Sequence, residues 1–299
     1  MSRYKLRANY DIENIDSQKM DGTVIVDVPM LSNGELNYGL SHIKKKLYEE
    51  NVYPSEIGFD IMSLATMVYM ADTRIERVVH GQDSWTREIE LEIPVSNVEI
   101  WDSQIRTVER MLKFLTGDLW KITLSSRAWQ FNNLEEVREK SNKYDEVSLF
   151  SGGMDSLIST INLMENKKNT LLISHAGEGL TKNAQKNIVN KFDLLYPDVL
   201  HTWLDLWMVF PRDYIPAGGN DNNTRSRSFL FIGYALFAMT GMDNINELLV
   251  PENGLIALNV PLDETRVGSF STRTTHPFYL SLWNELLVGL GLNLSVKNP

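Results

Sequence analysis

The chain contains no cysteine among its 299 residues. Disulfide bonds, thiolate metal ligands, thiol nucleophiles and persulfide carriers are therefore excluded from it. It also has no run of about 18 uninterrupted apolar residues, so the sequence predicts no membrane-spanning helix. The stretch MSRYKLRANYDIENID at its start lacks the apolar segment that a secretory signal needs. These absences are typical of a cytoplasmic protein.

Basic residues are also scarce, with 29 Lys and Arg against 39 Asp and Glu, and the net charge is −10. A protein that binds nucleic acid over a broad face needs clustered basic residues, so the charge argues against such a partner. Local basic sites for a small phosphate ligand stay open. With five histidines and no cysteine, no spacing typical of a structural zinc site exists. The 43% of hydrophobic residues are typical of a soluble globular protein.

The first 145 residues have a mixed pattern of strands and helices. Strands are predicted at 22–29, 87–94 and 118–126, and helices at 37–50, 55–78 and 103–117. The polar stretch EEVREKSNKYD (135–145) is interpreted as a domain boundary. We therefore predict an α+β N-terminal extension over residues 1–145, which carries no chemical motif and is a candidate for partner binding.

From residue 146 onward, strands and helices alternate. The predicted strands are 146–150, 170–174, 199–207 and 247–254, and the predicted helices are 155–168, 182–196 and 227–241. This order is typical of right-handed βαβ crossovers, and predicts a doubly wound parallel α/β sheet over residues 146–299. Ligands bind beyond the carboxyl ends of the strands in such sheets. The loops that follow the four strands are therefore expected to meet at one site.

The stretch SGGMDS (151–156) joins the first of these strands to its helix. Gly152 and Gly153 let the backbone approach a ligand, and the first N–H groups of a helix attract anions. Ser151 and Ser156 add hydroxyl donors for phosphate oxygens. Asp155 would repel a bare phosphate, and a Mg²⁺ ion between carboxylate and phosphate would resolve this conflict. An ordinary capped helix start is the alternative interpretation of the turn.

The same six residues resemble the PP-loop of the ATP pyrophosphatase superfamily, which has the HUP-type fold. Its enzymes cleave ATP between the α and β phosphates, adenylate a substrate oxygen and release pyrophosphate. The segment RSRSFLFIGYALFAMTGMDNINELLVPENG is similar to QueC-type 7-cyano-7-deazaguanine synthases. The segment PENGLIALNVPLDETRVGSFSTRTTHPFYL is similar to the QueC-like proteins of Qat-type antiphage systems. The resemblance covers about residues 146–299.

This resemblance implies ATP and Mg²⁺ as cofactors, with Mg²⁺ held near Asp155 through the ATP phosphates. It implies ATP-binding roles for Ser151, Gly152, Gly153, Met154, Asp155, Ser156 and His175. The implied acid is 7-carboxy-7-deazaguanine or a relative, and the acceptor is ammonia or an amine on a protein partner from the same defence operon. QueC binds zinc through a C-terminal cysteine cluster, which this chain lacks, so no zinc cluster is expected. The family continues with a further segment after the position of Pro299, so the chain is expected to be shortened there.

Two arginines stand at the start of the apolar helix predicted over 227–241. Arg225 and Arg227 lie where the helix dipole disfavours cations by a few tenths of a kcal/mol, which suggests a functional reason for them. We predict that both act on the ATP phosphates or on the developing charge of the adenylate. Solvated surface arginines are the alternative.

Five further residues are candidates for substrate binding. Glu252 and Asn253 end the fourth strand, where they could read the edge of a purine-like base or simply form a turn. Arg266, Arg273 and His276 follow in DETRVGSFSTRTTHP, a basic stretch that suits a carboxylate or phosphate. A solvated loop is the alternative for these three.

The sequence thus predicts an ATP-dependent ligase or synthase that adenylates a carboxylate and forms a C–N bond in antiphage defence. Two alternatives stay open. One is a PP-loop enzyme that modifies tRNA, against which the acidic charge and the missing cysteines count. The other is a non-catalytic subunit that binds ATP within a defence complex, and it would differ from an enzyme in releasing no pyrophosphate.

Overall fold

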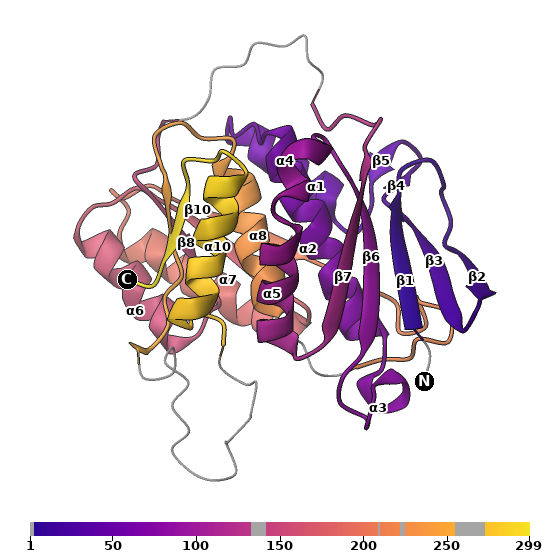
Figure 1. The fold of residues 1–299 in the computed structure, drawn as a ribbon. Helices are drawn as coiled ribbons and strands as arrows, with labels where there is room; N and C mark the ends of the chain where they lie inside the picture. Colours follow the sequence, from indigo (N-terminus) through magenta and orange to yellow (C-terminus); the bar gives the residue numbers. More distant parts are fainter. Residues whose placement is uncertain (1–2, 133–141, 209, 222–224, 255–272) are drawn as a thin grey trace.

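The computed structural model describes residues 3–132, 142–208, 210–221, 225–254 and 273–299 (Figure 1). They form two five-stranded sheets with helices between them, one sheet from each half of the chain. Most of the predicted boundary at 135–145 lies outside the described residues. One hydrophobic core contains side chains from both halves, so the two sheets are packed into a single body.

The N-terminal sheet has the strands β1 (Arg3–Asn9), β2 (Asp16–Met20), β3 (Thr23–Pro29), β6 (Glu88–Val95) and β7 (Leu119–Ser126). They lie in the order β2-β3-β1-β6-β7, and all neighbours are parallel except β2 and β3. Two short strands, β4 (Leu31–Ser32) and β5 (Glu35–Leu36), pair with each other. The predicted α+β extension is thus a mostly parallel sheet, because β1, which the sequence analysis does not find, joins β3 to β6.

The C-terminal sheet has the strands β8 (Glu146–Leu149), β9 (Thr170–Ala176), β10 (His201–Trp207), β11 (Glu247–Leu249) and β12 (Ser295–Lys297). All neighbours are parallel, and the order is β10-β9-β8-β11-β12. The predicted parallel α/β arrangement is confirmed, and it is compatible with a Rossmann-like fold. The connections run in opposite directions from β8 and β11, which makes the gap between them the topological switch point.

The helices of the N-terminal half are α1 (Leu40–Glu49), α2 (Glu56–Arg74), α3 (Arg77–His80), α4 (Val98–Asp102) and α5 (Ile105–Thr116). Those of the C-terminal half are α6 (Met154–Glu165), α7 (Gly179–Leu195), α8 (Arg227–Met239) and α10 (Pro277–Gly289). Within the described part of the chain, no helix is long and apolar enough to cross a membrane.

Four of these helices fill the space between the sheets as two packed pairs (Figure 1). Helix α2 packs on β1 and β6 and against α8, which covers β8 and β9. Helix α5 packs on β7 and against α10, which lies beside β12. A Cβ on Gly233 of α8 would lie 2.9 Å from the Cβ of Ala65 in α2, so small residues allow this close approach. The far face of the C-terminal sheet is covered by α6 and α7.

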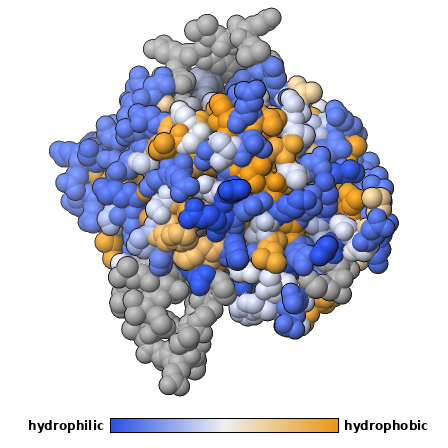
Figure 2. Space-filling model, viewed as in Figure 1, coloured by the Kyte–Doolittle hydropathy of each residue, from blue (hydrophilic) through white to orange (hydrophobic). Residues whose placement is uncertain are grey.

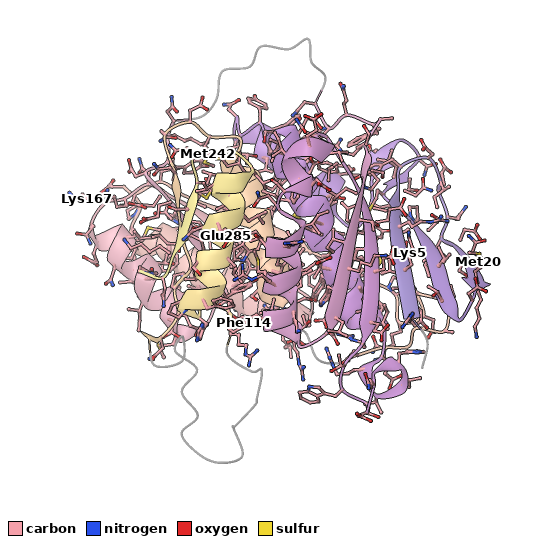
Figure 3. All side chains as sticks on the ribbon, in the orientation of Figure 1. Lys5, Met20, Phe114, Lys167, Met242 and Glu285 are labelled. Carbon is pink, nitrogen blue, oxygen red and sulfur yellow. The ribbon has the colours of Figure 1, made fainter. Side chains whose placement is uncertain are left out.

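The other face of the N-terminal sheet carries charged side chains in pairs. Lys5 (Figure 3) lies 3.1 Å from Glu90 and 2.9 Å from Glu92, and Arg7 forms an ion pair with Asp27. Along β1 and β6 these charged residues alternate with buried apolar ones, as expected for a sheet with one face toward water. The surface in Figure 2 is likewise mostly hydrophilic, with small hydrophobic patches between.

Helix α2 ends at Arg74, four residues before the end that the apolar pattern predicts. Ile75 is extended, with φ −119° and ψ 104°. Arg87 donates hydrogen bonds of 2.9 and 2.6 Å to the carbonyls of Asp72 and Ile75, which satisfies acceptors that the helix end leaves open. The helix therefore stops because of a tertiary contact that the local sequence does not reveal.

Candidate functional site

The loop between β8 and α6 forms the turn that the SGGMDS motif predicts. The Ser151 hydroxyl accepts a 3.2 Å hydrogen bond from the Gly153 N–H and lies 3.1 Å from the Ser156 hydroxyl. Helix α6 begins at Met154, so the N–H groups of its first turn have no carbonyl partner within the helix. Gln185 of α7 fixes the loop by donating a 3.0 Å hydrogen bond to the Ser151 carbonyl.

Gly152 is the residue of this loop that tolerates no side chain. Its φ is 82°, and a Cβ there would lie 3.0 Å from Cγ of Gln185. We expect Gly152→Ala to destabilise the fold by about 1–2 kcal/mol through backbone strain, and to weaken ATP binding by displacing the loop. Urea unfolding and calorimetric titration with Mg-ATP measure the two effects.

The matched control is Gly291→Ala, which puts a Cβ at φ 71° with no described atom within 4 Å of it. It should cost similar stability and leave nucleotide affinity unchanged. If both variants bound Mg-ATP as the wild type does, the loop around Gly152 would not be a nucleotide site.

A cavity of about 440 Å³ lies at the switch point, beyond the ends of β8 and β11, and we call it the switch-point cavity. Apolar walls come from Leu115 of α5 and Phe231 of α8. Six of the residues that the sequence predicts for the site line it, namely Ser151, Ser156, Arg225, Arg227, Glu252 and Arg273. Hydroxyl donors, guanidinium groups and a carboxylate are therefore brought together from four separate segments.

The arginines of this cavity are held by carbonyl groups from other parts of the chain. Arg227 donates a 3.1 Å hydrogen bond to the carbonyl of His175 at the end of β9. Arg225 donates a 2.9 Å hydrogen bond to the Thr116 carbonyl of α5. Arg273 donates one of 2.6 Å to the carbonyl of Phe114, whose position Figure 3 marks. Two of the three guanidinium groups thus depend on α5 of the N-terminal half.

Asp155 and Glu252 form a pair of carboxylates beside the switch-point cavity. Both line a smaller cavity of about 220 Å³ next to it, and their side chains are close enough to share a hydrogen bond. Burial, together with the charge of Asp155, raises the pKa of Glu252. Asn298, after β12, donates a 3.1 Å hydrogen bond to the Glu252 carbonyl and accepts one of 3.1 Å from its N–H.

A third cavity, of about 640 Å³, lies beyond the ends of β9 and β10, and we call it the β9–β10 cavity. Arg227 lines both this cavity and the switch-point cavity. His175 is fully buried in its wall, and burial together with the charge of Arg227 lowers the pKa of His175 to about 4, so its ring is neutral at pH 7. Tyr69 of α2 packs edge-on against this ring at 5.4 Å, so the N-terminal half closes the cavity.

Five of the predicted site residues that the structure describes do not line these cavities, namely Gly152, Gly153, Met154, Asn253 and His276. Met154 has a side chain 70% exposed at the start of α6, and Asn253 is exposed. His276 is the N-cap of α10, where its Nδ1 accepts a 3.1 Å hydrogen bond from the Phe278 N–H. Arg266 lies outside the described residues.

Four residues that support the site from a distance carry no signal in the sequence. Gln185, Thr116, Tyr69 and Asn298 contact the site through tertiary packing, and each belongs to a segment without a motif. The three residues of β12, SVK, are too few to show a strand period. Only the alternation of buried Tyr4, Leu6 and Ala8 in β1 gave a signal for the missing part of the fold.

No family model, curated protein or solved structure matches this chain. The residues of the motif and the geometry of the three cavities are therefore the indications of function.

Proposed function

We propose that the protein is an ATP-dependent synthase that adenylates a carboxylate at the carboxyl edge of its C-terminal sheet and then forms an amide. The observation that carries this proposal is the grouping of the six predicted residues around the switch-point cavity. The sheet is proposed to be of the HUP type, with SGGMDS as its PP-loop. The proposed acid is 7-carboxy-7-deazaguanine or a close relative, and the proposed setting is antiphage defence.

In this proposal, the loop 151–156 binds the β and γ phosphates, because its hydroxyls and first-turn N–H groups suit anions. The nucleoside of ATP lies in the β9–β10 cavity, beside His175. Arg227, which lines both cavities, then contacts the α phosphate between them. The acid lies against the apolar walls of the switch-point cavity, and Arg273 offers its guanidinium to a carboxylate.

The carboxylate pair of Asp155 and Glu252 suits a Mg²⁺ ion, because hard oxygen ligands are those that Mg²⁺ prefers. Among the described residues, no group of three or more potential metal ligands lies together. A bound ion would therefore take its remaining ligands from phosphate oxygens and water, as is usual for Mg²⁺ with nucleotides. When bound, Mg²⁺ supplies positive charge against the phosphate oxygens and against the repulsion within the pair.

The proposed reaction needs positioning and charge stabilisation rather than covalent help from the protein. A carboxylate oxygen of the acid attacks the α phosphorus, the bond to the bridging oxygen of the β phosphate breaks, and pyrophosphate leaves. Arg225 and Arg227 donate hydrogen bonds to the oxygens of the α phosphate, on which negative charge develops in the transition state. An amine then attacks the acyl carbon, AMP leaves, and the proton of the amine passes to solvent. The amine is ammonia or an amino group of a partner protein.

Exchange of labelled pyrophosphate into ATP tests the proposed adenylation directly. We expect exchange that requires Mg²⁺ and 7-carboxy-7-deazaguanine, because the adenylate forms reversibly before the amine arrives. ATP that binds without any exchange, with every acid tried, would favour the alternative of a non-catalytic ATP-binding subunit.

The carboxylate pair makes a separate prediction about stability. The pKa of Glu252 is raised in the folded protein, so ionisation of Glu252 destabilises the fold. The stability of the fold is therefore expected to decrease as the pH rises from the ordinary glutamate pKa through the raised one. Mg²⁺ alone should restore that stability at pH 7, with a rise in Tm of about 2–4 °C. The Glu252→Gln variant should show a smaller rise. Differential scanning calorimetry between pH 4 and 8, with and without Mg²⁺, measures this. An equal rise in Tm with Mg²⁺ in the wild type and in Glu252→Gln would show that Glu252 does not bind the metal.

A further inference from the structure

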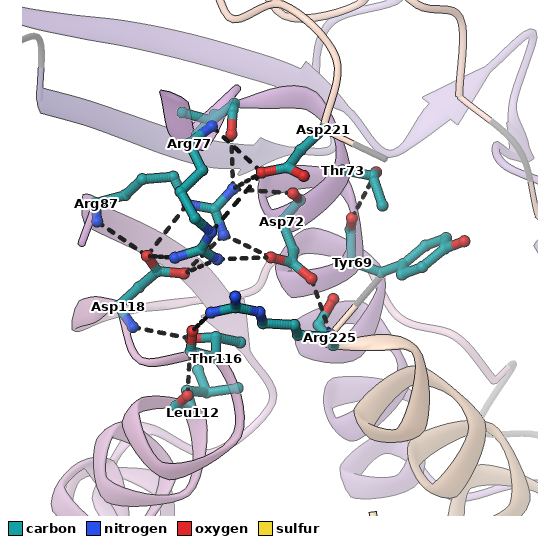
Figure 4. Close-up of polar contacts among 12 residues, drawn as sticks. Tyr69, Asp72, Thr73, Arg77, Arg87, Leu112, Thr116, Asp118, Asp221 and Arg225 are labelled. Carbon is teal, nitrogen blue, oxygen red and sulfur yellow. Dashed lines mark hydrogen bonds and ion pairs between the residues drawn. The ribbon is translucent and has the colours of Figure 1, made fainter. Parts of the chain in front are cut away.

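A buried cluster of charged residues joins the N-terminal half to the start of α8 (Figure 4). We call it the charge cluster, and it consists of Asp72, Arg77, Arg87, Asp118 and Asp221. The side chains of the first four are at most 6% exposed, and that of the fifth is 12% exposed. None of these residues belongs to the motif or to the cavity walls at the switch point.

Asp72 connects this cluster to the arginines of the switch-point cavity. Its Oδ1 accepts a 2.5 Å hydrogen bond from Arg87, within the cluster. Its Oδ2 accepts a 2.8 Å hydrogen bond from the backbone N–H of Ser226. Ser226 stands between Arg225 and Arg227, so one carboxylate holds the backbone at the centre of this pair.

The segment before α8 is held at a second point by the same cluster. The backbone N–H of Asp221 donates a 3.1 Å hydrogen bond to the Thr73 carbonyl. The side-chain Oδ2 of Asp221 accepts a hydrogen bond of 3.2 Å from the backbone N–H of Arg77. Hydrogen bonds to ionised groups are about twice as strong as neutral ones, and buried networks of them are rigid. The cluster therefore restricts the backbone on both sides of residues 222–224.

Arg225 belongs to this arrangement through its guanidinium as well. It lies next to the cluster in Figure 4, donates to the Thr116 carbonyl, and stands 4.6 Å from the ring centre of Trp85. The cluster itself holds three carboxylates and two guanidinium groups. Burial and the nearby charge of Arg77 lower the pKa of Arg225, whereas the carboxylates of Asp118 and Asp72 oppose this shift, so Arg225 is coupled to the charge cluster.

We infer that Asp72 is a positioning residue, which acts through the Ser226 N–H to place Arg225 and Arg227 for the reaction at the switch-point cavity. This inference rests on the proposed function, and it gives the N-terminal half a part in catalysis without contact to the substrate. Arginines that meet charge developing in the transition state affect turnover more than ground-state binding. A shift in their position should therefore lower kcat while KM for ATP changes little.

The Ser226→Pro variant removes the N–H on which this link depends and leaves every charge of the cluster in place. The φ of Ser226 is −82°, near the value that proline requires, and the ring carbon that replaces the N–H hydrogen moves the Asp72 carboxylate away from this backbone position. Ser226→Ala is the matched control, because it keeps the N–H and removes a hydroxyl that has no hydrogen-bond partner among the described residues. Two readouts are compared, pyrophosphate release and hydrogen exchange of the backbone in the ligand-free protein.

We expect Ser226→Pro to lower kcat by roughly ten- to a hundredfold, the scale of a misplaced catalytic group. KM for ATP should change less than threefold. Tm should fall below that of the control, because the buried Oδ2 of Asp72 loses its donor, so kcat is measured well below both unfolding transitions. Hydrogen exchange should accelerate in 210–221 and in the first turn of α8, and Ser226→Ala should match the wild type in all of these.

Three results would overturn the inference. The first is an unchanged kcat in Ser226→Pro, and the second is a loss of kcat of equal size in Ser226→Ala. The third is faster backbone hydrogen exchange in Ser226→Pro without a loss of kcat, which would mean a structural role alone. A wild-type protein that forms no adenylate at all would instead refute the proposed function. In that case, backbone hydrogen exchange at the same rate in Ser226→Pro and in Ser226→Ala would refute the link to Asp72 as well.

Discussion

Replacing Asp155 with asparagine is expected to lower the rate of pyrophosphate release by about 10²–10³-fold, the scale of losing one electrostatic contact in the transition state. The change keeps the size of the side chain and removes the charge that would bind Mg²⁺ beside Glu252. It also removes the repulsion within the carboxylate pair, so the folded state should lose no stability. Steady-state pyrophosphate release and thermal unfolding, measured on the same preparations, check both expectations.

Asp198→Asn is the matched control for this loss. Asp198 is exposed in the turn before β10, at the opposite edge of the sheet from the motif. It changes the net charge by the same amount and should retain full activity. An Asp155→Asn variant as active as the control would contradict a role of Asp155 in the site, and with it the interpretation of SGGMDS as a PP-loop.

The Asp118→Asn variant is expected to destabilise the fold by about 3–5 kcal/mol, because it leaves buried arginines without their partner. Asp118 accepts hydrogen bonds from Arg77 at 2.6 and 2.9 Å and from the Arg87 side chain at 2.6 and 3.2 Å. Burial opposes ionisation of Asp118, but the two arginines outweigh it and lower its pKa. Its contribution to stability is therefore present above the ordinary aspartate pKa and is lost as the pH falls through the lowered one.

Urea unfolding at pH 7 and near pH 3 measures this effect, and the difference from the wild type should shrink at the lower pH. Asp27→Asn is the control, because Asp27 also pairs with an arginine, Arg7, but on the water-facing side of the N-terminal sheet. Partly exposed pairs contribute about 1 kcal/mol or less. Equal losses in the two variants would contradict a special role for the charge cluster.

The fold could be predicted wherever one segment carries its own pattern. β9 is buried on both faces, and its run TLLIS was sufficient to predict it. α8 is buried along its whole length, as its continuous apolar sequence indicates. β1 was missed although its alternation of charged and apolar residues is typical of a strand with one face toward water, and β12 was missed because three residues carry no period. The parallel course of the N-terminal sheet depends on how β1 pairs, which no local pattern specifies.

The residues that make up the site could be predicted from the sequence, but the residues that hold them in place could not. The rule that ligands bind at the carboxyl ends of parallel strands was sufficient to bring Ser151, Arg227 and Glu252 together. The proximity of Glu252 to Asp155 was not predicted, because it depends on where Asn298 holds the chain after β11. His276 was expected at the substrate, and the structure places it at the N-cap of α10, outside the linings of the three cavities. The signal that suggested it, a basic stretch, does not distinguish a ligand contact from a helix cap.

The N-terminal half was the least predictable part, since it has no motif. Its contributions to the site include single contacts from α2 and α5: Tyr69 against His175, Asp72 to Ser226, Thr116 to Arg225, and Phe114 to Arg273. Each becomes visible only when the two sheets are packed together. Removal of the N-terminal half is therefore expected to disrupt the site itself, in addition to any surface that binds a partner.

Pyrophosphate release from Mg-ATP by the wild-type protein, with and without 7-carboxy-7-deazaguanine, tests the central claim most directly. The claim is that the residues around the switch-point cavity adenylate a carboxylate. We predict that release requires the acid, is matched by AMP in equal amounts once an amine is supplied, and falls by about 10²–10³-fold in Asp155→Asn. Release of inorganic phosphate and ADP instead, or tight binding of ATP with no release in the presence of the acid and an amine, would contradict the claim.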